Sequence, residues 1–207
     1  NSNLARFSGM MQGQRDLQTV SRVIMSELTP LVGAGHGAFF LAEEVEDSEP
    51  ELQLIASYGY KKRKNVANRF KLGESLVGQA ALERQSILIA EPPDDYVRVS
   101  SALGDAAPRN IVVMPVLFED QVMAVMELAS FQAFTDVQRG FLEQLGETIG
   151  IVINTIEANM RTEELLRQSQ GLTQELQERS EELQSQQEEL KRANSELEQQ
   201  AQTLKAS

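Results

Sequence analysis

The sequence predicts an α+β domain built on an antiparallel sheet, followed by a long helix of the coiled-coil type. Three observations predict this. Strand-like segments alternate with turns in the first 160 residues, amphipathic helices bracket them, and leucine recurs every seven residues in the last 47. From residue 161 onward there is no Pro, no aromatic residue and no β-branched residue except Thr. The chain therefore changes its kind of structure near residue 160.

Two amphipathic helices are expected at the ends of the sheet region. Residues 16–32 begin with Asp16, a residue type that favours the N-cap position, and the residues that follow form an apolar stripe at helical spacing. The second helix begins at residues 135–138, where Thr-Asp-Val-Gln has the spacing of a capping box. No Pro follows, so this helix is predicted to continue to residue 207. A short helix is also expected over residues 75–84.

The sheet is predicted from segments that alternate apolar and polar residues or are continuously apolar. An acidic turn at 46–50 joins the first two segments, and residues 91–108 are predicted to be irregular. The expected strands are residues 37–45, 52–58, 86–90, 110–118 and 121–129.

Composition excludes several classes of function. With 31 acidic and 19 basic residues the net charge is -12, which opposes binding to nucleic acid and direct contact with membranes. No Cys and a single His exclude thiol chemistry and most metal sites, so we expect no metal and no cofactor. No nucleophile and base stand in a recognisable arrangement, so we expect no enzyme activity.

Neither a membrane-spanning run nor a signal peptide is recognisable in the sequence. We therefore expect a piece of a longer cytoplasmic polypeptide, either free or as the cytoplasmic part of a membrane-anchored protein.

Seven leucines in two phased rows predict a coiled coil over residues 161–207. If the later leucines occupy the d positions of the heptad, the a positions are mostly polar, which favours a weak coil. These a positions are Thr173, Ser180, Gln187, Asn194 and Ala201. A four-residue step between the rows breaks the repeat of seven and is a place where the coil could switch. A single solvated helix and a disordered tract are the alternatives. The leucines are Leu165, Leu172, Leu176, Leu183, Leu190, Leu197 and Leu204.

The stretch Arg-Phe-Lys-Leu-Gly-Glu-Ser-Leu-Val-Gly-Gln-Ala-Ala at 69–81, with the strand that follows it to Ile89, resembles the GAF domains of bacterial sensor and hybrid histidine kinases. Gly33-Ala34 before the first strand and the hairpin at 111–128 support the resemblance. It implies a six-stranded antiparallel sheet with helices packed on one face and a small-molecule pocket on the other.

The last segment resembles the signalling helices that connect such domains to a kinase core. This implies three parts: a linker or helix at 1–15 that continues from an upstream domain, a GAF-like sensory domain at 16–160 and a signalling coiled coil at 161–207. It also implies a two-component system in which a parallel homodimer relays a pocket event to a downstream kinase domain. The phosphoacceptor histidine and ATP-binding motifs are missing here. A ligand-free dimerisation spacer is the alternative.

The resemblance places the pocket under the segment that links the middle strands. Asp95, Tyr96 and Arg98 are then expected to cover an unidentified small molecule. The expected floor is Phe40, Met114 and Met126. The alternative is an ordinary connection over a pocket filled by its own side chains.

Charged residues leave further alternatives open. Glu127 is expected either to contact the ligand or to pair with a base on a neighbouring strand. Arg69 and Arg98 are candidates for an anion, because a guanidinium offers a planar fork of donors. His36 is expected to form a structural hydrogen bond, and the basic run at 61–64 to be a solvated turn rather than a docking site.

Overall fold

The computed structural model describes residues 2–59 and 67–206. The chain divides into two compact units, which we call the body, Asn1–Ala158, and the tail, Asn159–Ser207. The basic run at 61–64 lies outside the described residues.

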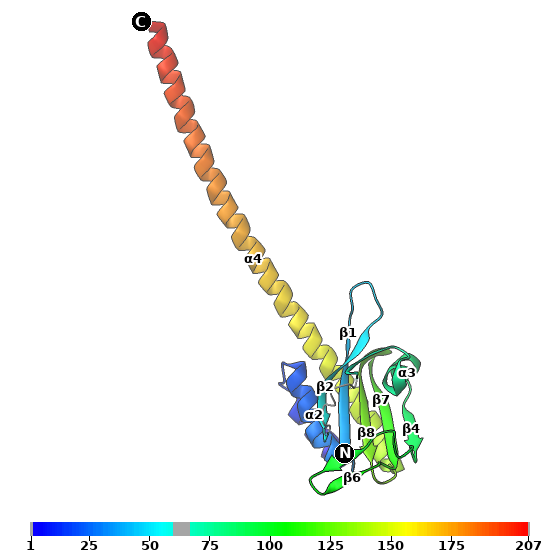
Figure 1. The fold of residues 1–207 in the computed structure, drawn as a ribbon. Coiled ribbons are helices and arrows are strands. Elements are labelled where there is room, and N and C mark those ends of the chain that lie inside the picture. Colours follow the sequence, from blue (N-terminus) through cyan, green and yellow to red (C-terminus); the bar gives the residue numbers. More distant parts are fainter. Residues whose placement is uncertain (1, 60–66, 207) are drawn as a thin grey trace. The chain divides into compact units, whose positions relative to one another are not determined.

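A six-stranded antiparallel sheet forms the centre of the body, as predicted (Figure 1). The strands lie in the order β3-β2-β1-β8-β7-β4, so the first and last long strands of the chain are neighbours in the middle of the sheet. The strands are β1 (His36–Glu43), β2 (Glu51–Tyr58), β3 (Arg69–Lys71), β4 (Ile87–Ala90), β7 (Asn110–Phe118) and β8 (Gln121–Ser130).

A small hairpin lies within the stretch that was predicted to be irregular. Its strands are β5 (Val99–Ser101) and β6 (Gly104–Ala106), and they pair only with each other. The prediction for 91–108 is wrong at these residues, because strands of three residues are too short to show an alternating pattern.

The terminal helices cover one face of the sheet. They are α1 (Ser2–Met11), α2 (Leu17–Leu31) and the first part of α4 (Asp136–Ala206). Phe7 and Met11 of α1 are buried, so residues before the expected boundary at 16 contribute to the same core. The largest side chains of this core include Ile24, Leu28, Phe39, Met114, Met126, Leu145 and Ile149.

The opposite face of the sheet is covered by α3 (Ser75–Glu83). A second, smaller core lies there, formed by buried residues of α3 and of the alternate positions on the strands. Its members include Phe40, Leu52, Val77, Ile111, Val113 and Val125.

Both predicted helix starts are present. The Asp16 carboxylate accepts hydrogen bonds from the backbone N–H groups of Gln18 (3.2 Å) and Thr19 (3.0 Å). At α4 the capping box is reciprocal: the backbone N–H of Thr135 donates to Oε1 of Gln138, and the backbone N–H of Gln138 donates to Oγ1 of Thr135. These caps fix where the two helices begin against the sheet.

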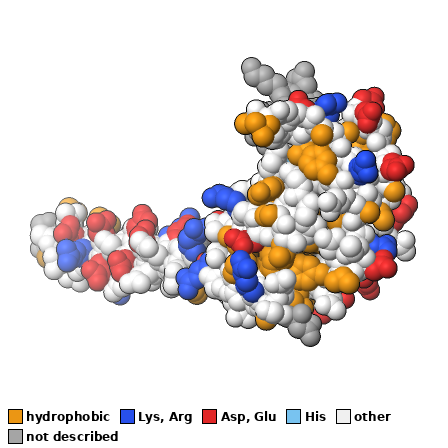
Figure 2. All heavy atoms as spheres, turned by 90° about the horizontal axis from the view of Figure 1, so that it is seen from below, with side chains coloured by type: hydrophobic (Ala, Val, Ile, Leu, Met, Phe, Trp, Pro, Cys, Tyr) orange, Lys and Arg blue, Asp and Glu red, His pale blue; other side chains and the backbone are white. Residues whose placement is uncertain are grey.

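The tail consists of α4 residues that are almost all exposed in the single chain. Charged side chains of both signs are interspersed along it (Figure 2). Within the described ranges, every helix is too short or too polar to cross a lipid bilayer.

Candidate functional site

The predicted ligand residues fall on two opposite faces of the sheet. Phe40 pairs with Val125 on β8, whereas Met126 pairs with Phe39. Neighbouring residues on a strand face opposite ways, so Phe40 and Met126 cannot share a floor. Met114 pairs with Met126 and lies with it in the core under α2 and α4. The predicted floor is therefore corrected: only Phe40 lies on the face covered by α3.

Glu127 lies on the same face as Phe40, in apolar surroundings. Its neighbours across the sheet are Ala38 on β1 and Val113 on β7, and both belong to the core under α3. The base that the sequence allowed on a neighbouring strand is thus not at these positions. No hydrogen bond or ion pair joins the carboxylate of Glu127 to another residue of the described part of the chain. Burial raises the pKa of the Glu127 carboxyl above its ordinary range.

Tyr96 lies in the loop between β4 and β5. Its side chain is partly exposed. Burial raises the pKa of the Tyr96 phenol, and the negative charge of Glu127 raises it further. The charge of Glu127 thus acts on a residue that lies 31 positions away in the printed sequence.

The other two predicted residues of this loop, Arg98 and Asp95, show no sign of a ligand-binding role. Nη2 of Arg98 donates a hydrogen bond to the backbone carbonyl of Asp105 (3.3 Å), which ties the loop to the β5-β6 hairpin. Asp95 is exposed. Within residues 2–59 and 67–206, neither side chain forms a hydrogen bond or an ion pair with Glu127.

Phe70 is a site residue that the sequence analysis missed. Its ring lies edge-on against the Phe40 ring, with the centroids 5.6 Å apart. Both are therefore part of the apolar surroundings under α3. The sequence pointed to Phe70, because this residue belongs to the stretch that carries the family resemblance. The sequence pattern did not predict which residue Phe70 contacts.

Chemically, this arrangement offers one carboxylate, one phenol and an apolar surface. A desolvated carboxylate favours a ligand that donates hydrogen bonds or carries positive charge, because such a group supplies the missing partner. Arg69 is not available for an anion, since it bridges Oε2 of Glu43 (3.0 Å) and Oε2 of Glu51 (3.2 Å) at the sheet edge.

His36 is buried at the start of β1, two positions before Ala38, which pairs with Glu127. Burial lowers the pKa of its imidazole, and a hydrogen bond with the backbone of Gly59 opposes that shift. This contact agrees with the structural role expected from the sequence. Within the described ranges, no three His, Asp or Glu side chains come together as a metal site.

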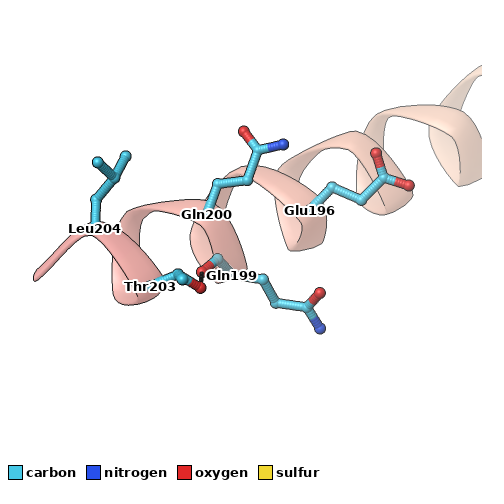
Figure 3. A pocket seen from close by; sticks show the side chains of 5 residues that line it. All are labelled: Glu196, Gln199, Gln200, Thr203 and Leu204. Atoms are coloured by element: carbon cyan, nitrogen blue, oxygen red, sulfur yellow. Dashed lines mark hydrogen bonds between the residues drawn. The ribbon is translucent and has the colours of Figure 1, made fainter. Parts of the chain in front are cut away.

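A surface hollow in the tail is not a ligand site of this kind. All five residues that line it belong to α4: Glu196, Gln199, Gln200, Thr203 and Leu204 (Figure 3). The Thr203 hydroxyl donates to the Gln199 carbonyl (2.8 Å), as is common within a helix. Because one helix supplies every lining side chain, the hollow offers no second wall to enclose a small molecule.

Comparisons with known proteins identify the fold. The GAF domain family matches residues 14–154 of this chain. A search of curated protein sequences found no significant match. Among solved structures, the GAF domain of a phosphoenolpyruvate-protein phosphotransferase from Coxiella burnetii is 16% identical, with a TM-score of 0.62, and 76% of this chain and 94% of that chain are covered.

Two further similar structures belong to proteins of other kinds. Residues 122 to 287 of a methyl-accepting chemotaxis protein are 16% identical (TM-score 0.56), with 73% of this chain and 97% of that chain covered. The free methionine-R-sulfoxide reductase of Neisseria meningitidis, solved with its substrate, is 17% identical (TM-score 0.60), with 75% and 89% covered.

The chain belongs to the GAF domain family, and the body contains its GAF sensory domain. The structural similarities lie below 20% identity and show a shared fold.

Proposed function

We propose that this chain is the sensory module of a cytoplasmic signal-transduction histidine kinase in a two-component system. It acts as a parallel homodimer, has no enzyme activity of its own, and relays a change in the body through a coiled coil to a downstream kinase domain. One observation carries the proposal: α4 starts on the GAF sheet and continues as one helix into a row of exposed leucines.

The exposed leucines support a dimer. All seven leucines predicted to form the coil have exposed fractions between 60% and 77% in the single chain. A row of leucines at every seventh residue is stabilised when a second helix covers it. A second chain that supplies the same row would bury these side chains.

Two glycines support a mechanical link between the sheet and α4. A Cβ placed on Gly150 would lie 2.1 Å from the carbonyl oxygen of Leu117, and one placed on Gly146 would lie 3.3 Å from Cε of Met114. The backbone of α4 thus rests directly on β7. Val113 of β7 lies on the opposite face of the sheet, in the candidate site next to Glu127.

The proposed relay follows from this contact. A ligand beside Glu127 shifts β7, and α4 moves with it because the two backbones are in contact. The polar heptad positions and the four-residue step from Leu172 to Leu176 leave the tail with packings of similar free energy. A small movement is then enough to favour one packing.

The test is to fuse the chain in heptad register to a histidine kinase core and to insert residues after Ala201. Inserting seven residues restores the phase of the coil, so autophosphorylation should stay near that of the parent fusion. Inserting two residues rotates the seam and should change it. Activity that does not depend on the phase of the insertion would contradict a coiled-coil relay.

The triple variant Ser180→Ile, Gln187→Ile, Asn194→Ile gives a second test. It should lock the coil and abolish the response of the kinase to changes in the body. Unchanged switching would contradict the relay.

A ligand-free dimerisation spacer is the second candidate. The contact between the Phe40 and Phe70 rings favours it, because these side chains fill part of the space under α3. A thermal-shift panel of metabolites and nucleotides separates the two candidates, since a ligand that binds the folded state raises the melting temperature. A flat panel, together with a dimer, would favour the spacer.

A further inference from the structure

We propose that the site beside Glu127, on the face of the sheet under α3, binds a small organic ammonium ion: a protonated primary amine with an apolar body. This deepens the proposed function, because it rests on the sensory role of the body and names the chemical class of its ligand. It sets aside two other classes, anions such as nucleotides and free metal ions.

The register of the sheet places uncharged side chains next to Glu127. Its direct neighbours are Ala38 on β1 and Val113 on β7. Residues two positions from Ala38 along β1 lie on the same face, so His36 and Phe40 are diagonal neighbours of Glu127. Burial lowers the pKa of the His36 imidazole, which is therefore neutral at pH 7. At these positions the carboxylate has no positive charge beside it.

The carboxylate of Glu127 is also within reach of a solute. Among the described residues, the fully enclosed side-chain oxygens that lack a hydrogen-bond partner belong to Thr29 and Asn68. Glu127 is only partly enclosed, and its carboxylate oxygens, which also lack a partner, are not in that group. They therefore keep contact with solvent. A ligand can displace this water and supply the donors that the carboxylate lacks.

A single carboxylate favours an ammonium ion over a metal ion. Ca²⁺ and Mg²⁺ need about six or more oxygen ligands, and within the described ranges no three acidic or His side chains come together. A primary ammonium can instead donate charge-assisted hydrogen bonds to the two oxygens of Glu127. A quaternary ammonium has no N–H and would leave the carboxylate without a donor.

The basic residues that could attract an anion are engaged elsewhere. Arg69 bridges two glutamates at the sheet edge, and Arg98 donates to the backbone carbonyl of Asp105. An anion beside Glu127 would meet a like charge in a chain whose net charge is -12. The charge of the site therefore selects a cation.

Aromatic side chains select the body of the ligand. The Phe40 ring, diagonal to Glu127, packs edge-on against Phe70, with the centroids 5.6 Å apart. The charge of Glu127 also acts on the phenol of Tyr96 and raises its pKa, so this ring stays neutral at pH 7. Aromatic rings attract an ammonium group through their faces, and an apolar surface favours a hydrocarbon body over a hydrated one.

Four small molecules that share a benzyl or phenyl group test the ligand class in the unmodified chain. At pH 7 benzylamine is a cation with N–H donors, benzyltrimethylammonium is a cation without them, benzyl alcohol is neutral and benzoate is an anion. Isothermal titration calorimetry at fixed ionic strength measures the binding of each. A difference among them therefore reports the charge and the donors that the site requires.

Two variants locate the binding. Glu127→Gln keeps the shape of the side chain and removes its charge. Glu119→Gln removes one charge at the exposed turn between β7 and β8, so it measures the general attraction of an acidic chain for cations. Circular dichroism checks that both variants fold.

We expect benzylamine to bind the unmodified chain and Glu119→Gln equally, with one site per chain. Its affinity for Glu127→Gln should fall about tenfold or more. In the unmodified chain the other three molecules should bind about tenfold more weakly than benzylamine, or less. If Glu127→Gln does not fold, the comparison of the four molecules still decides the result.

Three results would overturn the inference: no binding of benzylamine, equal binding of benzyl alcohol, or unchanged binding of benzylamine to Glu127→Gln. Each would leave the proposed relay standing, since the insertions into α4 of the kinase fusion test that relay separately. Conversely, a fusion whose activity does not depend on the phase of the insertion would contradict the relay without changing the affinity for benzylamine.

Discussion

The same helix, α4, carries leucines with opposite environments in the body and in the tail. Leu142 and Leu145 are buried against the sheet, whereas Leu176 and Leu183 are at least 60% exposed. The body therefore stabilises its part of α4 by contacts within one chain. The leucines of the tail are exposed in the single chain, and an isolated polar helix is marginal in water. The difference shows that the two regions depend on different partners for their stability.

The largest effect is expected where the tail depends on a second chain. The double variant Leu183→Glu, Leu190→Glu places charges in the seam, so the dimer should dissociate and the tail should lose most of its helix. Circular dichroism and sedimentation velocity measure this. The matched control Ser185→Glu, Ser195→Glu adds the same charge at positions off the row and should change little. Equal loss in both variants would contradict a leucine seam.

The next effect tests the contact between the body and its own part of α4. Gly150→Ala places a Cβ against the backbone of β7, which cannot yield as a side chain does, and should destabilise the body by about 1–3 kcal/mol. Gly140→Ala is the matched control, because nothing lies within 4 Å of its added Cβ. That variant should gain about 0.5–1 kcal/mol from its better helix propensity. Urea unfolding measures both, and a neutral Gly150→Ala would contradict the close approach.

A smaller effect is expected at the candidate site. The folded-state pKa of Glu127 is raised, so the folded body binds its proton more tightly than the unfolded chain. Stability then falls as the pH rises from the ordinary value of 4.5 through the raised value. Glu127→Gln removes this penalty and should stabilise the body by about 1 kcal/mol at pH 7, with no gain below pH 4. A gain that is the same at both pH values would show that ionisation is not the cause.

The smallest effect concerns His36. Its folded-state pKa lies below the ordinary 6.5, so the unfolded chain binds the proton more tightly and stability falls as the pH drops below 6.5. The loss between pH 8 and pH 6 is at most about 0.8 kcal/mol. His36→Gln should remove this part of the slope in urea unfolding. An unchanged slope would mean that the imidazole is not responsible.

The sequence predicted the helix starts and the long strands because their signals are local. Asp16, Thr135 and Gln138 act through hydrogen bonds to residues two or three positions away. The strand segments follow from alternation, which needs no knowledge of the partner strand. Such features depend on short stretches of chain, and the structure confirms them.

The candidate site was harder to predict because it depends on the pairing of distant strands. Phe40 and Met126 were both reasonable apolar choices, but a shift of one residue in register turns a side chain to the other face. The environment of Glu127 likewise depends on Ala38 and Val113, which only the register places beside it. The position of Tyr96 depends on a loop that has no periodic pattern.

Sedimentation equilibrium of the unmodified chain at micromolar concentration tests the central claim most directly. We expect a single species with twice the mass of one chain, which is 23.0 kDa. A species with the mass of one chain would contradict the dimer, and with it the relay through α4.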